Sequence, residues 1–309
     1  MNINLLNICN DCIFEISSFI NTRDMLYLSS TSKILYNILM HNKINMIKHK
    51  FTIKKNIYNL KFIKNISYKI RNLNFNRNKN IRDKDFKYLR EIHTLDMSYC
   101  SQNTITDNAF EYLKNIHTLN ISGCKQITDK SFQHLKGIHT LYIRNCRQKT
   151  ITNKAFEYLK STKILDMSNC NQETITDKAF EYLKDIHTLN ISNCWQNTIT
   201  DKAFKHLKNI HTIDISYCTQ LTNITFKYLK NIRCLYLSFC NLETVTYRAF
   251  EHLKYINYIY FECSDQYRIT DTVLKALTNI HSLNISYRNE NLIPYELLQY
   301  LYINGTNIS

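Results

Sequence analysis

The sequence predicts an α/β solenoid, in which about ten parallel strands line the inside of a horseshoe and helices cover its outside. Three observations predict this fold. Residues 105–124 and 175–194 carry the same twenty-residue segment with only three differences. A cysteine closes that segment in seven copies, which follow one another at intervals of 22 or 24 residues. The chain of 309 residues has only 3 glycines and 1 proline, too few for a turn-rich β-sandwich or a glycine-rich phosphate loop.

Each copy begins with a short predicted strand. In the copy that ends at Cys124, apolar Leu119 and Ile121 alternate with polar Thr118 and Asn120. This alternation is typical of a strand with one buried face and one exposed face. The cysteine is small and apolar, so it fits the buried turn that follows the strand.

A helix is predicted after the turn. Thr128 and Asp129 offer side-chain oxygens that can cap the N-terminus of a helix, and Phe132 and Leu135 recur at helical spacing. One such unit, with a helix of about two turns, cannot bury its apolar face alone, whereas stacked units form a continuous core. Because helices are wider than strands, we expect the stack to bend with its strands on the concave side.

The buried positions resemble the pattern of leucine-rich repeats, L-x-x-L-x-L-x-x-N/C-x-L, since the copy around Cys124 has the form L-x-x-I-x-x-L-x-I-x-x-C-x-x-I. The ending C-x-x-I-T-D resembles the cysteine-containing class of these repeats. Asn78 precedes the cysteine series, and Ser264 and Arg288 continue it. The resemblance implies a right-handed leucine-rich-repeat solenoid at residues 73–292. Residues 293–309 are predicted to form a C-terminal cap.

Residues 1–50 do not repeat, and their apolar spacing predicts three short helices. A helical cap for the first strand is the simplest interpretation. The segment also resembles an F-box, with Phe19-Ile20, Asp24-Met25 and Lys33 at family positions, although Leu35 replaces the usual tryptophan and no proline follows Ile8. A basic connecting segment, residues 51–72, would join this all-α domain to the repeats. The resemblance implies that ten residues contact a Skp-family adaptor: Ile8, Ile13, Ile16, Phe19, Ile20, Asp24, Met25, Leu28, Lys33 and Leu35.

An F-box followed by leucine-rich repeats implies the substrate-recognition subunit of a cullin-type ubiquitin ligase. The whole chain is similar to F-box/leucine-rich-repeat proteins of giant amoeba-infecting DNA viruses. If the N-terminal helices are only a cap, the protein is instead a protein-binding scaffold without a ligase link. Residues 43–90 hold fifteen Lys and Arg against Asp83 and Asp85, which leaves association with nucleic acid as a third and weaker interpretation, because codon bias toward Lys explains the block more simply.

The sequence predicts no enzyme, no cofactor and no metal site. It has no P-loop, no G-x-S-x-G and no H-E-x-x-H motif. Cys9 and Cys12 have the spacing of half a zinc site, but no second half follows. One histidine precedes most strands, and this row is expected to be a solvated rim: His93, His117, His139, His187, His211 and His281.

The expected compartment is cytoplasmic or nuclear, in a host cell if the chain is viral. The N-terminus lacks a basic segment followed by a long apolar stretch, so no secretory signal is predicted. No run of about 18 apolar residues occurs, so no membrane span is predicted. Eleven cysteines in a reducing compartment are expected to be free thiols.

The target-binding residues are predicted at the concave positions that do not carry the small polar residues found in most units. Most units place Thr, Asn, Asp or Ser there, whereas three units carry Tyr or Arg, the residue types enriched in binding hot spots. Drift in older repeats is the alternative explanation. The predicted target-binding residues are Tyr142, Arg144, Tyr236, Phe239, Tyr258, Tyr260 and Glu262.

Overall fold

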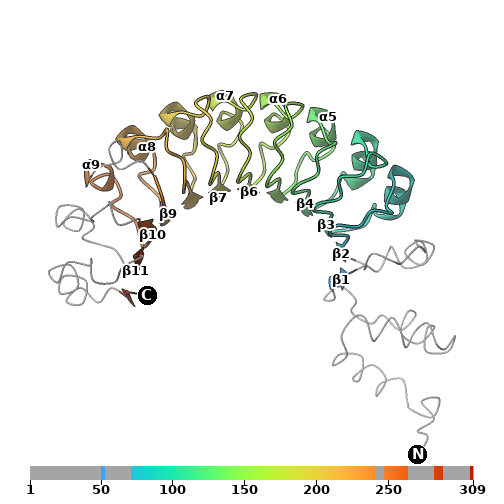
Figure 1. Cartoon of the computed structure of the whole chain (residues 1–309), viewed down its shortest axis with the longest axis horizontal. Helices are drawn as coiled ribbons and strands as arrows, with labels where there is room; N and C mark the ends of the chain where they lie inside the picture. Colours follow the sequence, from blue (N-terminus) through green and yellow to red (C-terminus); the bar gives the residue numbers. More distant parts are fainter. Residues whose placement is uncertain (1–49, 53–70, 241–246, 264–281, 288–306, 309) are drawn as a thin grey trace, which may run out of the picture.

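The computed structural model describes residues 50–52, 71–240, 247–263, 282–287 and 307–308. Its strands pair in chain order, each parallel to the next, in one sheet on the inside of a horseshoe (Figure 1). The predicted solenoid is therefore confirmed. The strands are β1 (Lys50–Thr52), β2 (Asn72–Asn74), β3 (Thr94–Asp96), β4 (Thr118–Asn120), β5 (Thr140–Tyr142), β6 (Ile164–Asp166), β7 (Thr188–Asn190), β8 (Thr212–Asp214), β9 (Cys234–Tyr236), β10 (Tyr258–Cys263), β11 (Ser282–Tyr287) and β12 (Asn307–Ile308).

Short helices cover the convex side (Figure 1). Among the described residues, four of the eight helices have only four residues, so the prediction of about two turns was too long for these coils. The other four, one α-helix and three 3₁₀ helices, have six or seven residues. A repeat of 22 or 24 residues leaves little chain for the outer side. The helices are η3 (Asp83–Tyr88), η4 (Asp107–Leu113), α5 (Asp129–Phe132), α6 (Asn153–Phe156), α7 (Asp177–Phe180), η5 (Asp201–His206), α8 (Asn223–Tyr228) and α9 (Tyr247–Phe250).

The Thr-Asp pair of the repeat links each helix to the next coil. The Thr128 hydroxyl accepts a hydrogen bond from the Lys130 backbone N–H, so it caps its own helix as predicted. Asp129 reaches forward instead: its carboxylate accepts from the backbone N–H and the hydroxyl of Thr152 at 2.8 and 2.7 Å. The same bonds join Asp177 to Thr200 in a later pair of coils. Each aspartate therefore fixes the cap of the following helix.

The core is a continuous column of buried side chains between the strands and the helices. Leucine or isoleucine fills the centre of each strand from β2 to β10. On the helical side one phenylalanine per coil is almost fully buried, and Phe180 and Phe204 pack with ring centroids 6.1 Å apart. We call this column the phenylalanine spine; it consists of Phe86, Phe110, Phe132, Phe156, Phe180, Phe204, Phe226 and Phe250.

The repeated cysteines are buried, and their thiols bridge adjacent coils. The thiol of Cys170 donates to the Ile143 carbonyl at 3.1 Å, and that of Cys194 donates to the Met167 carbonyl at 3.2 Å. Burial raises the pKa of Cys194 to about 12, so its thiol stays protonated at neutral pH. Seven cysteines share this buried position, and all are free: Cys100, Cys124, Cys146, Cys170, Cys194, Cys218 and Cys240.

These seven thiols should be unreactive in the folded protein. Since the chain has eleven cysteines, at most four should react quickly with a thiol reagent at pH 8, and all eleven should react once the unreduced protein is unfolded. Both burial and a raised pKa withhold the reactive thiolate. A spectrophotometric titration before and after denaturation measures both counts. A total near nine or below would reveal a disulfide and contradict the expected reducing compartment.

Candidate functional site

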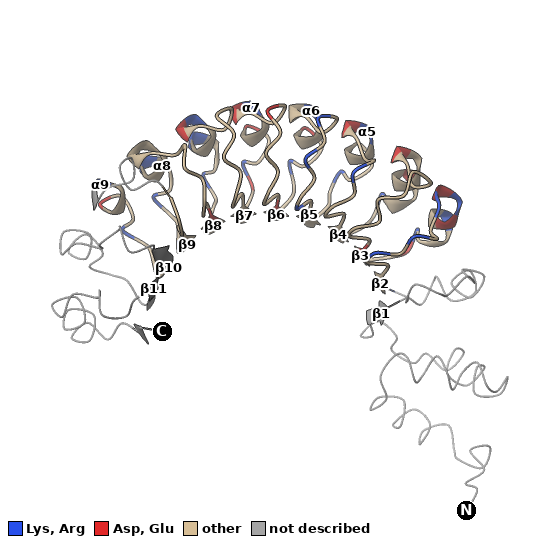
Figure 2. Cartoon of the chain, in the orientation of Figure 1, with Lys and Arg blue, Asp and Glu red and all other residues tan. Residues whose placement is uncertain are grey.

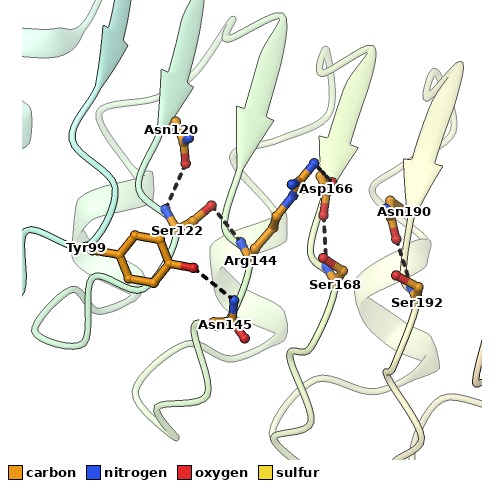
Figure 3. A network of polar contacts seen from close by, with 9 residues as sticks. All are labelled: Tyr99, Asn120, Ser122, Arg144, Asn145, Asp166, Ser168, Asn190 and Ser192. Atoms are coloured by element: carbon orange, nitrogen blue, oxygen red, sulfur yellow. Dashed lines mark hydrogen bonds and ion pairs between the residues drawn. The ribbon is translucent and has the colours of Figure 1, made fainter. Parts of the chain in front are cut away.

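The concave face is the surface on which the sequence places the candidate site. Along its middle row, Asp and Asn side chains accept hydrogen bonds from the backbone two residues further on: Asn120 from Ser122 at 3.1 Å and Asp166 from Ser168 at 3.1 Å (Figure 3). Most of this face therefore has its polar groups already bonded within the chain. The middle row runs in register through Asn74, Asp96, Asn120, Tyr142, Asp166, Asn190, Asp214, Tyr236 and Tyr260.

Tyr142 and Arg144 form the first departure from this pattern. The Arg144 guanidinium is held by Asp166 on the next strand, with distances of 2.7 Å from Nε and 2.6 Å from a terminal nitrogen to the same carboxylate oxygen (Figure 3). It also lies 5.7 Å from the centre of the Tyr142 ring. Because Asp166 is buried, this ion pair is shielded from water on one side. The charge of Arg144 is thus already engaged inside the chain.

Tyr236 and Tyr260 form the second departure, as the sequence predicts from their neighbouring strands. Their rings stack with centroids 4.4 Å apart and planes 7° apart. Both side chains are half-buried. Burial raises the pKa of Tyr236 to about 12, and the neighbouring groups, Cys234 and Asp214 among them, add to this effect. The phenol therefore stays neutral and can donate a hydrogen bond. We call these two residues the tyrosine pair.

A second aromatic stack lies at the edge where the strands end. Phe239 follows Tyr236 by three residues, and its ring stacks on Tyr217 of the preceding coil with centroids 4.7 Å apart. Both residues have a left-handed backbone, with φ of 54° and 62°. Of the eight described coils with this turn, four place Asn or Gly at this position, the residues that tolerate this conformation best. A bulky aromatic side chain there costs backbone strain, and such strain tends to occur at functional sites.

Sequence reasoning missed three exposed aromatic residues at this edge. Tyr217 is 40% exposed, Tyr99 46% and the single tryptophan, Trp195, 57%. None lies on a strand, so the search of strand positions passed over them. For Tyr99 and Tyr217 the available signal was the left-handed turn position three residues after the strand, whereas Trp195 directly follows Cys194 and lies outside that position. At Tyr99 the ring covers Gly123, where any Cβ would lie 2.6 Å from a ring carbon.

The remaining predicted site residues are placed as follows. Tyr258 lies at the start of β10 and is 42% exposed. Glu262 lies on the same strand, but its side chain is outside the described residues. All ten predicted adaptor contacts, from Ile8 to Leu35, also lie outside them. The aromatic residues on β9 and β10 and at the adjacent edge thus form the densest candidate surface.

Charge is distributed unevenly over the horseshoe. The strands are largely uncharged, and charged residues gather on the helices and loops (Figure 2). Three rows of side chains face the concave side: the first and third residues of each strand and the residue two positions further on. Between Asn72 and Tyr260 only four residues in these rows are charged: Asp96, Arg144, Asp166 and Asp214. This face therefore carries a formal charge of −2, although the whole chain carries +15.

Basic residues line the edge where the strands begin. One exposed Lys or Arg stands four residues before each strand from β3 to β10. A groove of about 640 Å³ lies on this edge between Lys208, Arg233 and Lys254, with Tyr255 beside it. The basic residues of the edge are Arg90, Lys114, Lys136, Lys160, Lys184, Lys208, Lys230 and Lys254.

The row of histidines lies just ahead of the strands. His93, His117 and His139 stack in series, with centroids 4.4 and 4.5 Å apart. Burial, together with repulsion from His93 and His139, lowers the pKa of His117. Among the described residues, no three His, Cys, Asp or Glu side chains come together in a way that could hold a metal ion. None of the helices in that part of the chain is both long and apolar enough to cross a lipid bilayer.

Comparison with solved structures agrees with this architecture. The chain is similar to a chain of the TLR13–ssRNA13 complex, with a TM-score of 0.60 and 20% identity over 88% of this chain and 40% of that one. It is also similar to a chain of the Toll–Spatzle complex of Drosophila, with a TM-score of 0.50 and 14% identity over 81% and 40%. These identities establish the fold alone, and this chain spans less than half of either relative. No curated protein matches.

Family models match both parts of the chain. The model of the BspA type leucine rich repeat region matches in six copies, over residues 79–211 and 173–300. The F-box domain model matches residues 5–46. The predicted F-box and leucine-rich repeats are therefore confirmed, and the chain belongs to the BspA-type leucine-rich repeat family and carries an F-box domain ahead of its repeats.

Proposed function

We propose that this protein is the substrate-recognition subunit of a cullin-type ubiquitin ligase. The F-box docks on a Skp-family adaptor, and the concave face of the solenoid binds the target protein. The observation that carries the proposal is the combination of an F-box match with an open solenoid, because both are protein-interaction modules. The protein then catalyses nothing itself: it raises the concentration of the target near a ubiquitin-loaded enzyme.

The target site in this proposal centres on strands β9 and β10. The tyrosine pair supplies contact area on the concave face, and the stack of Tyr217 on Phe239 extends that area over the edge. Tyrosine contributes large area and a polar group at low entropic cost, which is why it is frequent in binding hot spots. The polar coils of β3, β4, β6 and β7 lie on one side of the site, and their concave side chains are already hydrogen-bonded within the chain.

Adaptor binding tests the proposal directly. Met25→Asp introduces a charge where the F-box resemblance places a buried contact, so it should abolish co-purification of a co-expressed Skp-family adaptor. The matched control is Lys178→Asp, which introduces the same side chain at an exposed position of the solenoid and should leave adaptor recovery unchanged. If the adaptor is recovered equally well after deletion of residues 1–42, the ligase function fails and a scaffold without a ligase link replaces it.

A further inference from the structure

The protein contains an internal example of arginine recognition. On neighbouring strands β5 and β6, Tyr142 and Asp166 are partners in register. The Arg144 guanidinium is ion-paired with the Asp166 carboxylate (Figure 3). It also lies 5.7 Å from the centre of the Tyr142 ring. A planar guanidinium suits this pair because it can stack on a ring while its edge donates to a carboxylate.

The same pair of side chains recurs on β8 and β9 without an arginine. Asp214 and Tyr236 are partners in register, in the reverse order along the solenoid. The two positions that correspond to Arg144 on these coils are occupied by Ser216 and Ser238. Within the described part of the chain, Asp214 makes no ion pair; its carboxylate accepts a hydrogen bond from the Ser216 backbone N–H at 3.0 Å.

The surroundings of Asp214 favour an external cation. Partial burial raises the pKa of Asp214, because a carboxylate that loses water is destabilised, and the hydrogen bonds from Ser216 and the more distant charge of Arg144 offset this only in part. Tyr260 stacks behind Tyr236 and enlarges the aromatic wall beside the carboxylate. The concave rows are formally negative on a molecule of charge +15, so a basic ligand is attracted to this face more than to the basic edge where the strands begin.

Asp96, the other concave aspartate without an ion pair among the described residues, lacks the aromatic half of the arrangement. Its partners in register are Asn74 and Asn120, which offer no ring face. Its carboxylate also accepts bonds from both the backbone N–H and the hydroxyl of Ser98. Asp96 therefore serves as an internal comparison: it has the charge, but it does not have the ring.

We propose that Asp214, Tyr236 and Tyr260 bind an arginine side chain of the target, with the guanidinium ion-paired to Asp214 and stacked on Tyr236. This inference rests on the proposed function for its biological setting, because it specifies the chemistry of the target at the same surface. The partner is a basic segment that presents at least one arginine to β8, β9 and β10. Lysine fits less well, because an ammonium cannot stack and donate in one plane.

The full-length protein and synthetic peptides test this site. The probe is a fluorescent nonapeptide of glycine and serine with one central arginine, compared with the same peptide carrying citrulline, which is neutral and nearly isosteric. Anisotropy titrations should show that the arginine peptide binds at least about tenfold more tightly, and that Asp214→Asn removes this preference. Asp96→Asn should leave it unchanged. Equal binding of the two peptides, or an Asp214→Asn variant that binds normally, overturns the proposal.

A gain of binding provides a second and independent test. Arg144→Ser should free Tyr142 on β5 and Asp166 on β6 from their internal arginine. The double variant with Asp214→Asn should therefore bind the arginine peptide in preference to the citrulline peptide again, now at Tyr142 and Asp166. Circular dichroism verifies that the double variant is folded. A folded double variant without this preference contradicts the role of the Asp–Tyr pair. Because the peptides bind without an adaptor, loss of adaptor binding by Met25→Asp leaves this result unaffected, and the two proposals fail separately.

Discussion

Phe180→Ala should lower the free energy of unfolding by about 3–5 kcal/mol. Phe180 belongs to the phenylalanine spine and is fully buried between α7 and the strands, next to Phe204. Alanine removes the ring and leaves a cavity that the neighbouring coils close only in part. Since each coil is stabilised by its neighbours, the loss weakens the stack on both sides. Urea unfolding of the full chain, followed by circular dichroism, measures the change.

Phe239→Asn is the matched control, since it also removes a phenylalanine but from the edge of the horseshoe. Phe239 has φ of 54°, and three other coils carry asparagine at this left-handed position. Asparagine tolerates that backbone better than an aromatic residue does, so the free energy of unfolding should stay the same or rise. Equal losses in the two variants would mean that the edge stack contributes as much stability as the spine, which would contradict the special weight that we assign to burial in the spine.

The repeat made most of the fold predictable. A strand with one buried face and a buried cysteine after it can be recognised in a single unit, and the constant spacing then determines the register of all strands. Leu119 therefore pairs with Leu95 and Leu141 as the pattern predicts. The outer side was less predictable, because coils of the same 24-residue spacing contain either a short α-helix, as in α6 and α7, or a 3₁₀ helix, as in η4 and η5.

The repeated aspartate makes hydrogen bonds to the next coil, and the sequence of a single unit does not predict this contact. Capping by Thr128 is local and follows from the sequence. Asp129, however, bonds Thr152, which is 23 residues away. Only the stacking of the coils brings Asp129 and Thr152 together. Capping rules that consider one helix at a time therefore assign the Asp129 carboxylate to its own helix.

The candidate site was predictable in part for the same reason. Tyr236 and Tyr260 stand at equivalent strand positions, so their contact follows from the register. The ion pair of Arg144 with Asp166 depends on the direction of a long side chain, which register does not determine. Tyr217 and Phe239 meet because a left-handed turn points both rings along the edge. That turn becomes apparent only in the structure.

Replacing both Tyr236 and Tyr260 by alanine should weaken capture of the target at least tenfold, or about 1.4 kcal/mol. The two rings are half-buried on the concave face and stack on each other with centroids 4.4 Å apart. Removing them takes away the stack and the ring faces that we assign to the target. Thermal stability should change little, because the buried residues beneath them, Leu235 and Ile259, remain.

The comparison for this double variant is the corresponding pair of changes at Thr118 and Asn120. These residues occupy the concave positions of β4, where the side chain of Asn120 is already bonded to the Ser122 backbone. Quantitative mass spectrometry of proteins that co-purify with each variant should show the loss only for the tyrosine pair, and titration with the recovered target then gives the ratio of dissociation constants. Equal loss from both pairs would show that the target contacts the polar coils as well. The hot spot would then not be confined to β9 and β10, because binding energy spread along the whole face leaves no pair of residues dominant.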